Sequence, residues 1–207
     1  MTKPGDPARI KLRKKPQQER SIQRLDAILE AATALIVERG IVDMRMTDLA
    51  ARAGVPIGSL YQFFPEKAAV VRAIFDRRTQ ATRARLTELF AAVSSIEEIL
   101  EAIFHTIDWH FAVYRQDPVW MALWAASMID RDLMELQRKH SEGLAAIFRA
   151  AAAPLITEGT AERMEARSIL FMHLTGAMLR LAAQHDEKTA LQMLDEWKSV
   201  VREQLFK

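Results

Sequence analysis

The sequence contains no cysteine among its 207 residues, and glycine and proline occur only seven times each. Without cysteine the chain has no disulfide framework, no zinc site built on thiolates and no cysteine nucleophile. No apolar run approaches the ~20 residues of a membrane-spanning helix, and no apolar stretch follows the charged N-terminus as in a secretory signal. Half of the residues are apolar and 27% are charged, an ordinary globular composition. We therefore expect a soluble, cytoplasmic protein with one large domain or two small ones.

The charge is unevenly placed along the chain. The net charge is +2, yet residues 1–24 carry eight basic and two acidic side chains, and the remainder is mildly acidic. Residues 1–19 contain proline and glycine but no apolar period, so they are predicted to form a flexible basic arm. Such an arm indicates a polyanionic partner near the N-terminus, and a merely solubilising tail is the alternative. Charge alone leaves open whether Arg13, Lys14 and Lys15 contact DNA.

Helical periodicity begins at Ser21, and Gly40 supplies the first helix stop. A second, short helix is expected between a cap at Thr47 and a stop at Gly54. Further helices are expected at residues 59–64, 66–92, 95–115, 117 onward, 130–153, 160–184 and 187–206. No segment combines strand alternation with hairpin turns. The sequence therefore predicts an all-α fold of about nine helices in two parts.

The most informative segment is 45–67, where two short helices flank a tight turn at 55–58. This pattern is typical of a helix-turn-helix, whose second helix enters the major groove of DNA. Six of its residues suit contacts with DNA: Thr47, Gly58, Ser59, Tyr61, Gln62 and Lys67. Gly58 lets backbone and phosphate approach closely, and Gln62 offers both a donor and an acceptor to a base. The alternatives are structural, with Thr47 as a helix cap and Lys67 as a solvated lysine.

The segment resembles the DNA-binding domain of the tetracycline-repressor (TetR) family of bacterial transcription regulators. The residues that carry the resemblance are Glu38, Arg39, Gly40, Thr47, Leu49, Ala50, Ala53, Gly54, Val55, Gly58, Ser59, Leu60, Tyr61, Phe64 and Lys67. It implies DNA contacts from Thr47, Ser59, Tyr61 and Lys67, with Pro56 and Gly58 shaping the approach. We predict a DNA-binding surface made of Arg45, Thr47, Pro56, Ile57, Gly58, Ser59, Tyr61, Gln62, Phe63 and Lys67.

Two positions depart from the family's pattern. Pro56 stands where many members have a small hydroxyl residue, and Phe63 replaces a frequent histidine. The resemblance also implies that the family's helical ligand-binding and dimerisation domain occupies the rest of the chain. The predicted domains are the arm at 1–19, the helix-turn-helix domain at 20–67, and the effector-binding and dimerisation domain at 68–207.

Aromatic residues and methionines are dense between residues 104 and 128. Rings with a few polar tips can line an apolar ligand cavity, and an ordinary aromatic core is the alternative. The residues predicted to bind an effector are Phe104, His105, Trp109, Tyr114, Trp120, Met121, Trp124 and Met128.

Residues 168–182 are apolar nearly all round, so a helix there must be covered on both sides. We expect the last two helices to form a homodimer interface, with Gly176 and Ala177 allowing close approach; burial within one subunit is the alternative. A two-fold dimer would set the recognition helices about one DNA turn (~34 Å) or a multiple apart. The expected partners are therefore an inverted-repeat operator in double-stranded DNA, a small-molecule effector and a second copy of the chain, with no membrane.

No His-Glu-x-x-His, phosphate-loop or dinucleotide pattern is present. His105, Asp108 and His110 are close in sequence, but the two histidines diverge on a helix. No enzyme activity, cofactor or metal is predicted. The sequence predicts a DNA-binding transcriptional regulator, most simply a homodimeric repressor released from its operator by a small apolar or aromatic effector. The alternatives are a ligand-sequestering protein with a vestigial DNA head and a non-specific architectural DNA binder.

Overall fold

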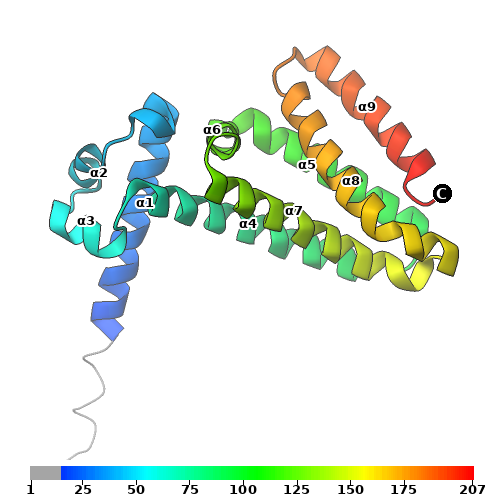
Figure 1. The fold of residues 1–207 in the computed structure, drawn as a ribbon, viewed down its shortest axis with the longest axis horizontal. Coiled ribbons are helices and arrows are strands. Elements are labelled where there is room, and N and C mark those ends of the chain that lie inside the picture. Colours follow the sequence, from blue (N-terminus) through cyan, green and yellow to red (C-terminus); the bar gives the residue numbers. More distant parts are fainter. Residues whose placement is uncertain (1–14) are drawn as a thin grey trace, which may run out of the picture. The chain divides into compact units, whose positions relative to one another are not determined.

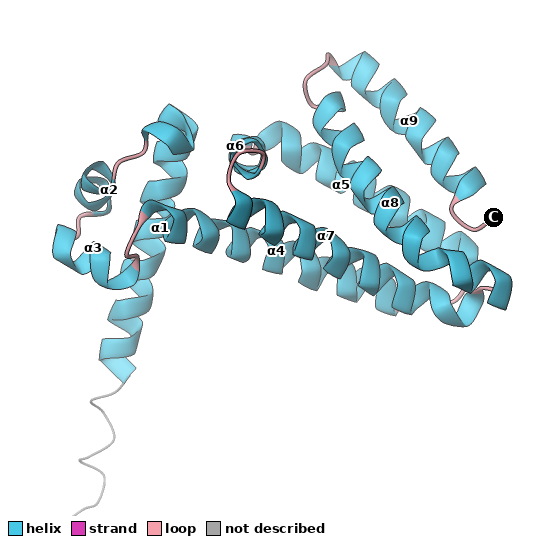
Figure 2. Cartoon of the chain, viewed as in Figure 1, coloured by secondary structure: helices cyan, strands magenta, loops and turns pink. Residues whose placement is uncertain are grey.

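The computed structural model describes residues 15–207, and every regular element among them is a helix (Figure 1, Figure 2). The elements are α1 (Lys15–Asp43), α2 (Met46–Ala53), α3 (Ile57–Phe63), α4 (Lys67–Ala91), α5 (Ile96–Gln116), α6 (Pro118–Ser127), α7 (Arg131–Ala152), a short 3-10 turn (Ala153–Leu155), α8 (Glu158–Ala182) and α9 (Glu187–Gln204). The predicted all-α class with about nine helices is confirmed over this part of the chain. None of these helices combines the length and the apolar character needed to cross a bilayer.

The chain divides into two compact units, with the boundary between Ile74 and Phe75 inside α4. In the first unit α1 packs on α2, and α2 packs on α3. One fully buried side chain from each of the first three helices forms the centre of this core: Ile28, Leu49 and Leu60. Burying three large aliphatic side chains contributes about 1.5–3 kcal/mol each, so this small core is what orients the two short helices.

Several helix boundaries in the first unit differ from those predicted. Helix α1 begins at Lys15 rather than Ser21, because a proline at the second position is tolerated where the first N–H groups have no intrahelical partner. Residues 15–19 of the predicted arm are therefore helical, and the rest of the arm, with Arg13 and Lys14, lies outside the described residues. The stop at Gly40 is confirmed, since its φ of 77° interrupts the helical path.

The predicted cap at Thr47 is wrong. Helix α2 begins at Met46 with Arg45 in the N-cap position and no side-chain cap. Its predicted stop is confirmed, because Gly54 has a φ of 65°, a left-handed conformation that favours glycine. Helix α3 begins at Ile57, two residues earlier than predicted. The fixed φ of −58° at Pro56 leads directly into the helix, so the turn is shorter than 55–58.

In the second unit the local start signals act as predicted. Helix α5 is capped by Ser95, whose Oγ accepts from the Glu98 N–H at 3.1 Å, while Glu98 accepts from the Ser94 N–H at 2.6 Å. Helix α6 is capped by Asp117, with Pro118 as its first residue. Helices α5, α7, α8 and α9 pack around two clusters of buried apolar side chains.

Candidate DNA-binding surface and effector cavity

Helix α3 has one buried side and one exposed side. Leu60 is fully buried, whereas Ile57 and Tyr61 are 42% and 49% exposed, and Gly58 and Gln62 are also exposed. Residues 57, 58, 61 and 62 share one side of a helix because 3.6 residues complete a turn. The exposed side therefore presents an aliphatic group, a bare backbone, a phenol and an amide. These are groups that can lie against base edges, and the amide can pair with a base through two hydrogen bonds.

The starts of α2 and α3 are also exposed. Arg45 and Thr47 are exposed at the start of α2, and Pro56 is exposed at the start of α3. Among the described residues, no side chain caps the first N–H groups of either helix. Uncapped N–H groups at the positive end of a helix dipole favour an anion such as a phosphate.

Two ion pairs hold α2 against α1 and remove negative charge from the surface. Asp48, the one acidic residue between positions 44 and 65, pairs with Arg39 at 3.0 Å. Glu38 pairs with Arg52 at 2.5 Å, and the hydrogen bond from Arg52 lowers the pKa of the Glu38 carboxyl. Both pairs are exposed, so each adds little stability. Their effect is to neutralise the carboxylates of Asp48 and Glu38 beside α2.

Seven of the ten residues predicted to form the DNA-binding surface are exposed, and three are half-buried: Ser59, Phe63 and Lys67. The Lys67 ammonium donates to the backbone carbonyl of Val42 at 2.7 Å. That contact joins the start of α4 to the end of α1, a structural role that sequence inspection missed because the partners are 25 residues apart.

The second unit contains a cavity of about 820 Å³ lined by residues from α4 to α9. Its walls are mainly apolar and aromatic, as in most small-molecule sites. Three of the eight predicted effector residues line it: Tyr114, Trp124 and Met128. On α5 the lining residues recur at three- and four-residue steps, as at Ile107 and His110, so that a single face of the helix meets the cavity.

The other five predicted residues are not among those that line this cavity. His105 is exposed beside Arg85 at 3.3 Å, and the Trp109 ring lies 4.7 Å below the same guanidinium. Phe104 packs between the two core clusters, the Trp120 ring lies 6.0 Å from an arginine of α4, and Met121 is half-buried. Some aromatic residues of α5 and α6 therefore line the cavity, whereas Trp109 and Trp120 lie outside its lining and are covered by arginines of α4. Whether an effector touches any of the five stays a prediction.

Three histidines that were not predicted to bind an effector line the cavity, namely His110, His140 and the exposed His173. Burial lowers the pKa of His110 to about 4, with nearby Arg85 acting in the same direction and the hydrogen bond to Thr106 opposing it. Burial, with His110 as the next cause, also lowers the pKa of His140 to about 4. Both rings are therefore neutral at pH 7. The four-residue step from His110 to Tyr114 could have identified the first, but nothing in the sequence of α5 points to a residue on α7.

Burial raises the pKa of the Tyr114 phenol, and Arg180 opposes that shift. The phenol therefore stays protonated and can donate a hydrogen bond inside the cavity. Within the described part of the chain, no three His, Asp or Glu side chains are grouped closely enough to hold a metal ion.

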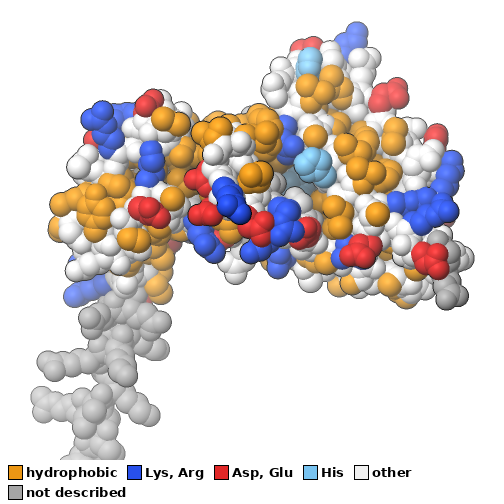
Figure 3. All heavy atoms as spheres, viewed as in Figure 1, with side chains coloured by type: hydrophobic (Ala, Val, Ile, Leu, Met, Phe, Trp, Pro, Cys, Tyr) orange, Lys and Arg blue, Asp and Glu red, His pale blue; other side chains and the backbone are white. Residues whose placement is uncertain are grey.

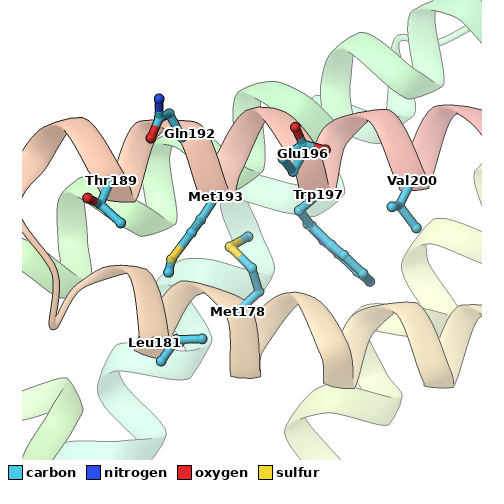
Figure 4. A pocket seen from close by; sticks show the side chains of 8 residues that line it. All are labelled: Met178, Leu181, Thr189, Gln192, Met193, Glu196, Trp197 and Val200. Carbon is cyan, nitrogen blue, oxygen red and sulfur yellow. The ribbon is translucent and has the colours of Figure 1, made fainter.

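A shallow groove of about 390 Å³ runs between α8 and α9 (Figure 4). Met178 from α8 and Met193 and Trp197 from α9 extend into the space between the two helices (Figure 4). Leu181, which lines the groove, is 51% exposed, and Leu174, seven residues earlier on α8, is 39% exposed. Figure 3 shows hydrophobic side chains at the surface in this part of the molecule. The apolar character expected for residues 168–182 is thus only partly covered within one chain.

Comparison with known proteins identifies both parts of the chain. Residues 28–74 match the model of bacterial regulatory proteins of the tetR family, and residues 97–207 match a tetracyclin repressor-like C-terminal domain. The HTH-type transcriptional regulator BetI of Escherichia coli (strain UMN026 / ExPEC) is 34% identical over 134 residues, which are 62% of this chain and 65% of BetI. The matches span 46–65% of the curated relatives' lengths, less than two thirds of each.

Solved structures share the fold. A TetR-family transcriptional regulator from Streptomyces coelicolor superposes with a TM-score of 0.66 at 23% identity, covering 89% of this chain and 99% of that one. A transcriptional regulator from Saccharomonospora viridis, solved in complex with choline, superposes with a TM-score of 0.63 at 16% identity, covering 90% and 99% of the two chains. At these identities the likeness concerns the fold alone.

Proposed function

Because this chain belongs to the TetR family of transcriptional regulators, we propose that it is a homodimeric repressor that an effector releases from an inverted-repeat operator. Residues 20–67 form the DNA-binding domain of this proposal, and residues 68–207 form the effector-binding and dimerisation domain. Binding of effector in the cavity favours a dimer whose recognition helices are wrongly spaced for the operator. The effector must then have a higher affinity for that state than for the DNA-binding state.

The observation that carries the proposal is the exposed side of α3. Tyr61 and Gln62 project from a helix that Leu60 anchors in the core, and the same domain has uncapped starts at α2 and α3. Base-edge groups on the helix and phosphate-binding groups beside it are the two kinds of contact that sequence-specific binding requires. Arg45 is exposed at the start of α2 and Arg39 neutralises Asp48, which favours association with DNA.

The effector part of the proposal is supported by the cavity and by the neighbouring structures. A volume of about 820 Å³ suits a molecule of drug size. The Saccharomonospora viridis regulator was solved with choline, and a regulator named FadR from Bacillus subtilis was solved with stearoyl-CoA. These two ligands differ greatly in size, and on this proposal the chemistry of the chain's own cavity decides which effector it takes.

Selection from a random duplex pool at fixed physiological salt tests the proposal, with the bound fraction sequenced. An enriched inverted repeat supports a sequence-specific dimer. Retained bulk binding without enrichment would instead identify a non-specific architectural binder, whose affinity depends steeply on salt. No binding at all would leave a ligand-sequestering protein whose DNA head is vestigial.

On the selected operator, Tyr61→Ala is expected to lower affinity about tenfold for all sequences, because it removes a contact group from the exposed side of α3. Gln62→Ala is expected to relax preference at one operator position by about 1–3 kcal/mol, the discrimination that a bidentate amide–base pair gives. Fluorescence anisotropy with operator variants measures both effects. Gln80→Ala, an exposed glutamine on α4 in the second unit, is the matched control. Unchanged operator affinity in both surface variants would mean that α3 does not enter the groove.

Lys67→Gln separates a phosphate contact from a structural role. If the ammonium leaves Val42 to bind a phosphate, the substitution lowers affinity for every sequence and reduces the slope of log affinity against log salt by about one. Anisotropy titrations between 50 and 200 mM salt measure that slope, with Lys188→Gln, an exposed lysine of α9, as control. An unchanged slope together with reduced thermal stability would assign Lys67 to the Val42 carbonyl alone.

A further inference from the structure

The effector cavity is lined by three charged side chains, Arg138, Glu142 and Arg180, whose surroundings differ. Arg138 and Glu142 pair with each other at 2.5 Å. Arg138 also pairs with Glu135 at 2.7 Å, and Lys139 lies 3.4 Å from the same carboxylate. This exposed group of two cations and two anions is balanced. Of the three charged residues that line the cavity, only Arg180 therefore has no oppositely charged partner among the other lining residues.

Arg180 is a half-buried cation without a carboxylate partner among the described residues. Its guanidinium carbon lies 4.8 Å from the centre of the Trp124 ring, a stacking contact that uses none of its N–H donors. One donor is hydrogen-bonded to the Tyr114 phenol, and a guanidinium has four more. Gly176, one turn earlier on α8, makes room for it, since a Cβ there would lie 3.1 Å from Nη1 of Arg180. Burying a guanidinium costs free energy unless an anion or hydrogen-bond acceptors compensate. A ligand that brings the anion would supply that compensation.

The neighbouring polar groups are neutral and suited to the same kind of ligand. Nδ1 of His110 donates to the Thr106 carbonyl at 3.0 Å, so Nε2 of the neutral ring is an unprotonated acceptor. His140 on α7 also lines the cavity, and His110 is near enough to contribute to lowering the pKa of His140. Each ring can take up a proton when an anion arrives. Tyr114, one turn after His110 on α5, adds a phenolic donor beside Arg180.

We propose that the effector of this regulator is an organic anion, an apolar carboxylate whose carboxylate group is bound by Arg180. The inference rests on the proposed function, in which this cavity is the effector site. A carboxylate accepts two parallel hydrogen bonds from a guanidinium, and its apolar body lies against the aromatic walls. A quaternary ammonium ion would meet an unpaired cation in Arg180 and find its only lining carboxylate, Glu142, already paired.

Three probes with one apolar body and different head groups test this inference: 4-phenylbutyrate, 4-phenylbutan-1-ol and (4-phenylbutyl)trimethylammonium. Isothermal titration measures affinity for the full chain. Tryptophan fluorescence, to which Trp124 in the cavity wall contributes with the other three tryptophans, gives a second signal. The anion is expected to bind at least tenfold more tightly than the alcohol and the cation, since hydrogen bonds between charged partners are the strong ones. Equal or weaker binding of the anion, including no detectable binding, would overturn the inference.

Substitutions show whether Arg180 provides the selectivity. Arg180→Met should remove the tenfold preference for the anion while leaving the alcohol's affinity within about twofold, and Arg180→Lys should retain part of the preference. Arg115→Met is the matched control, because Arg115 also stacks on a ring, Phe111, but lies outside the cavity lining. An anion preference that survives in Arg180→Met would assign the preference to other groups and overturn the inference.

Operator binding without any probe separates this inference from the proposed function. Arg115→Met, outside the cavity lining, is expected to bind the selected operator as the unaltered chain does. If the operator is bound but the cation or the alcohol is the preferred probe, the regulator proposal stands and the anion inference is wrong. If no operator is ever selected while the anion binds through Arg180, the anion inference stands and the repressor proposal is wrong.

Discussion

A chain in which Leu174 and Leu181 are both replaced by glutamate is expected to sediment as a monomer at micromolar concentration, whereas the unaltered chain sediments as a dimer. The two leucines lie seven residues apart on one side of α8, are 39% and 51% exposed, and do not line the effector cavity. A two-fold interface contains each substitution twice. Covering the exposed half of four leucines is worth ~3–6 kcal/mol, so the dimer dissociation constant should rise at least a hundredfold.

Leu191→Glu is the matched control for this experiment. Leu191 is 48% exposed, but it lies two residues before Met193 and therefore on the opposite side of α9 from the groove. Analytical ultracentrifugation should show that this variant still dimerises. The double variant should also bind the operator more weakly. Separate monomers lose the high effective concentration that a dimer gives its second DNA-binding domain at the second half-site. A double variant that remains a dimer would exclude this side of α8 from the interface.

The parts of the fold that sequence could predict are those that depend on neighbours within a helical turn or two. At the start of α5 Ser95 accepts from the Glu98 N–H and Glu98 accepts from the Ser94 N–H. Gly40 and Gly54 stop helices through their own φ angles. The exposed side of α3 follows from the same periodicity, because burying Leu60 determines which residues face outward. Such features need no knowledge of the tertiary structure.

The effector cavity depends on contacts that no local pattern encodes. Tyr114, His140 and Arg180 come from three helices and meet only after α5, α7 and α8 have packed. Aromatic density also misled the sequence analysis, because a ring can be covered by the stem and guanidinium of an arginine as well as by a ligand. Trp109 below Arg85 is the plainest case.

Between pH 6.5 and 4.5 the second unit is expected to lose on the order of 2 kcal/mol of unfolding free energy for each of His110 and His140. An unfolded histidine has a pKa of about 6.5, whereas burial holds both folded pKa values at about 4. In this window the unfolded chain binds protons that the folded chain does not, so acid favours unfolding. The positive charges of two arginines on α4 act in the same direction as burial: Arg85 lowers the pKa of His110, and Arg83 lowers the pKa of His140.

Urea unfolding followed by tryptophan fluorescence measures this loss in the second unit alone, since all four tryptophans lie between residues 109 and 197. The double variant His110→Leu, His140→Leu should flatten the pH dependence above pH 4.5, and His185→Leu, which replaces an exposed histidine, should leave it unchanged. The effect of the carboxylates can be separated from that of the histidines because carboxylates titrate at lower pH. Hydrogen bonds from Arg138 lower the pKa of Glu135 to about 2, so the contribution of Glu135 to stability is lost only as pH falls below about 4.5. A second unit whose stability stays constant down to pH 4.5 would mean that the two histidines are charged in the folded cavity, where they would attract an anionic effector by charge from the outset.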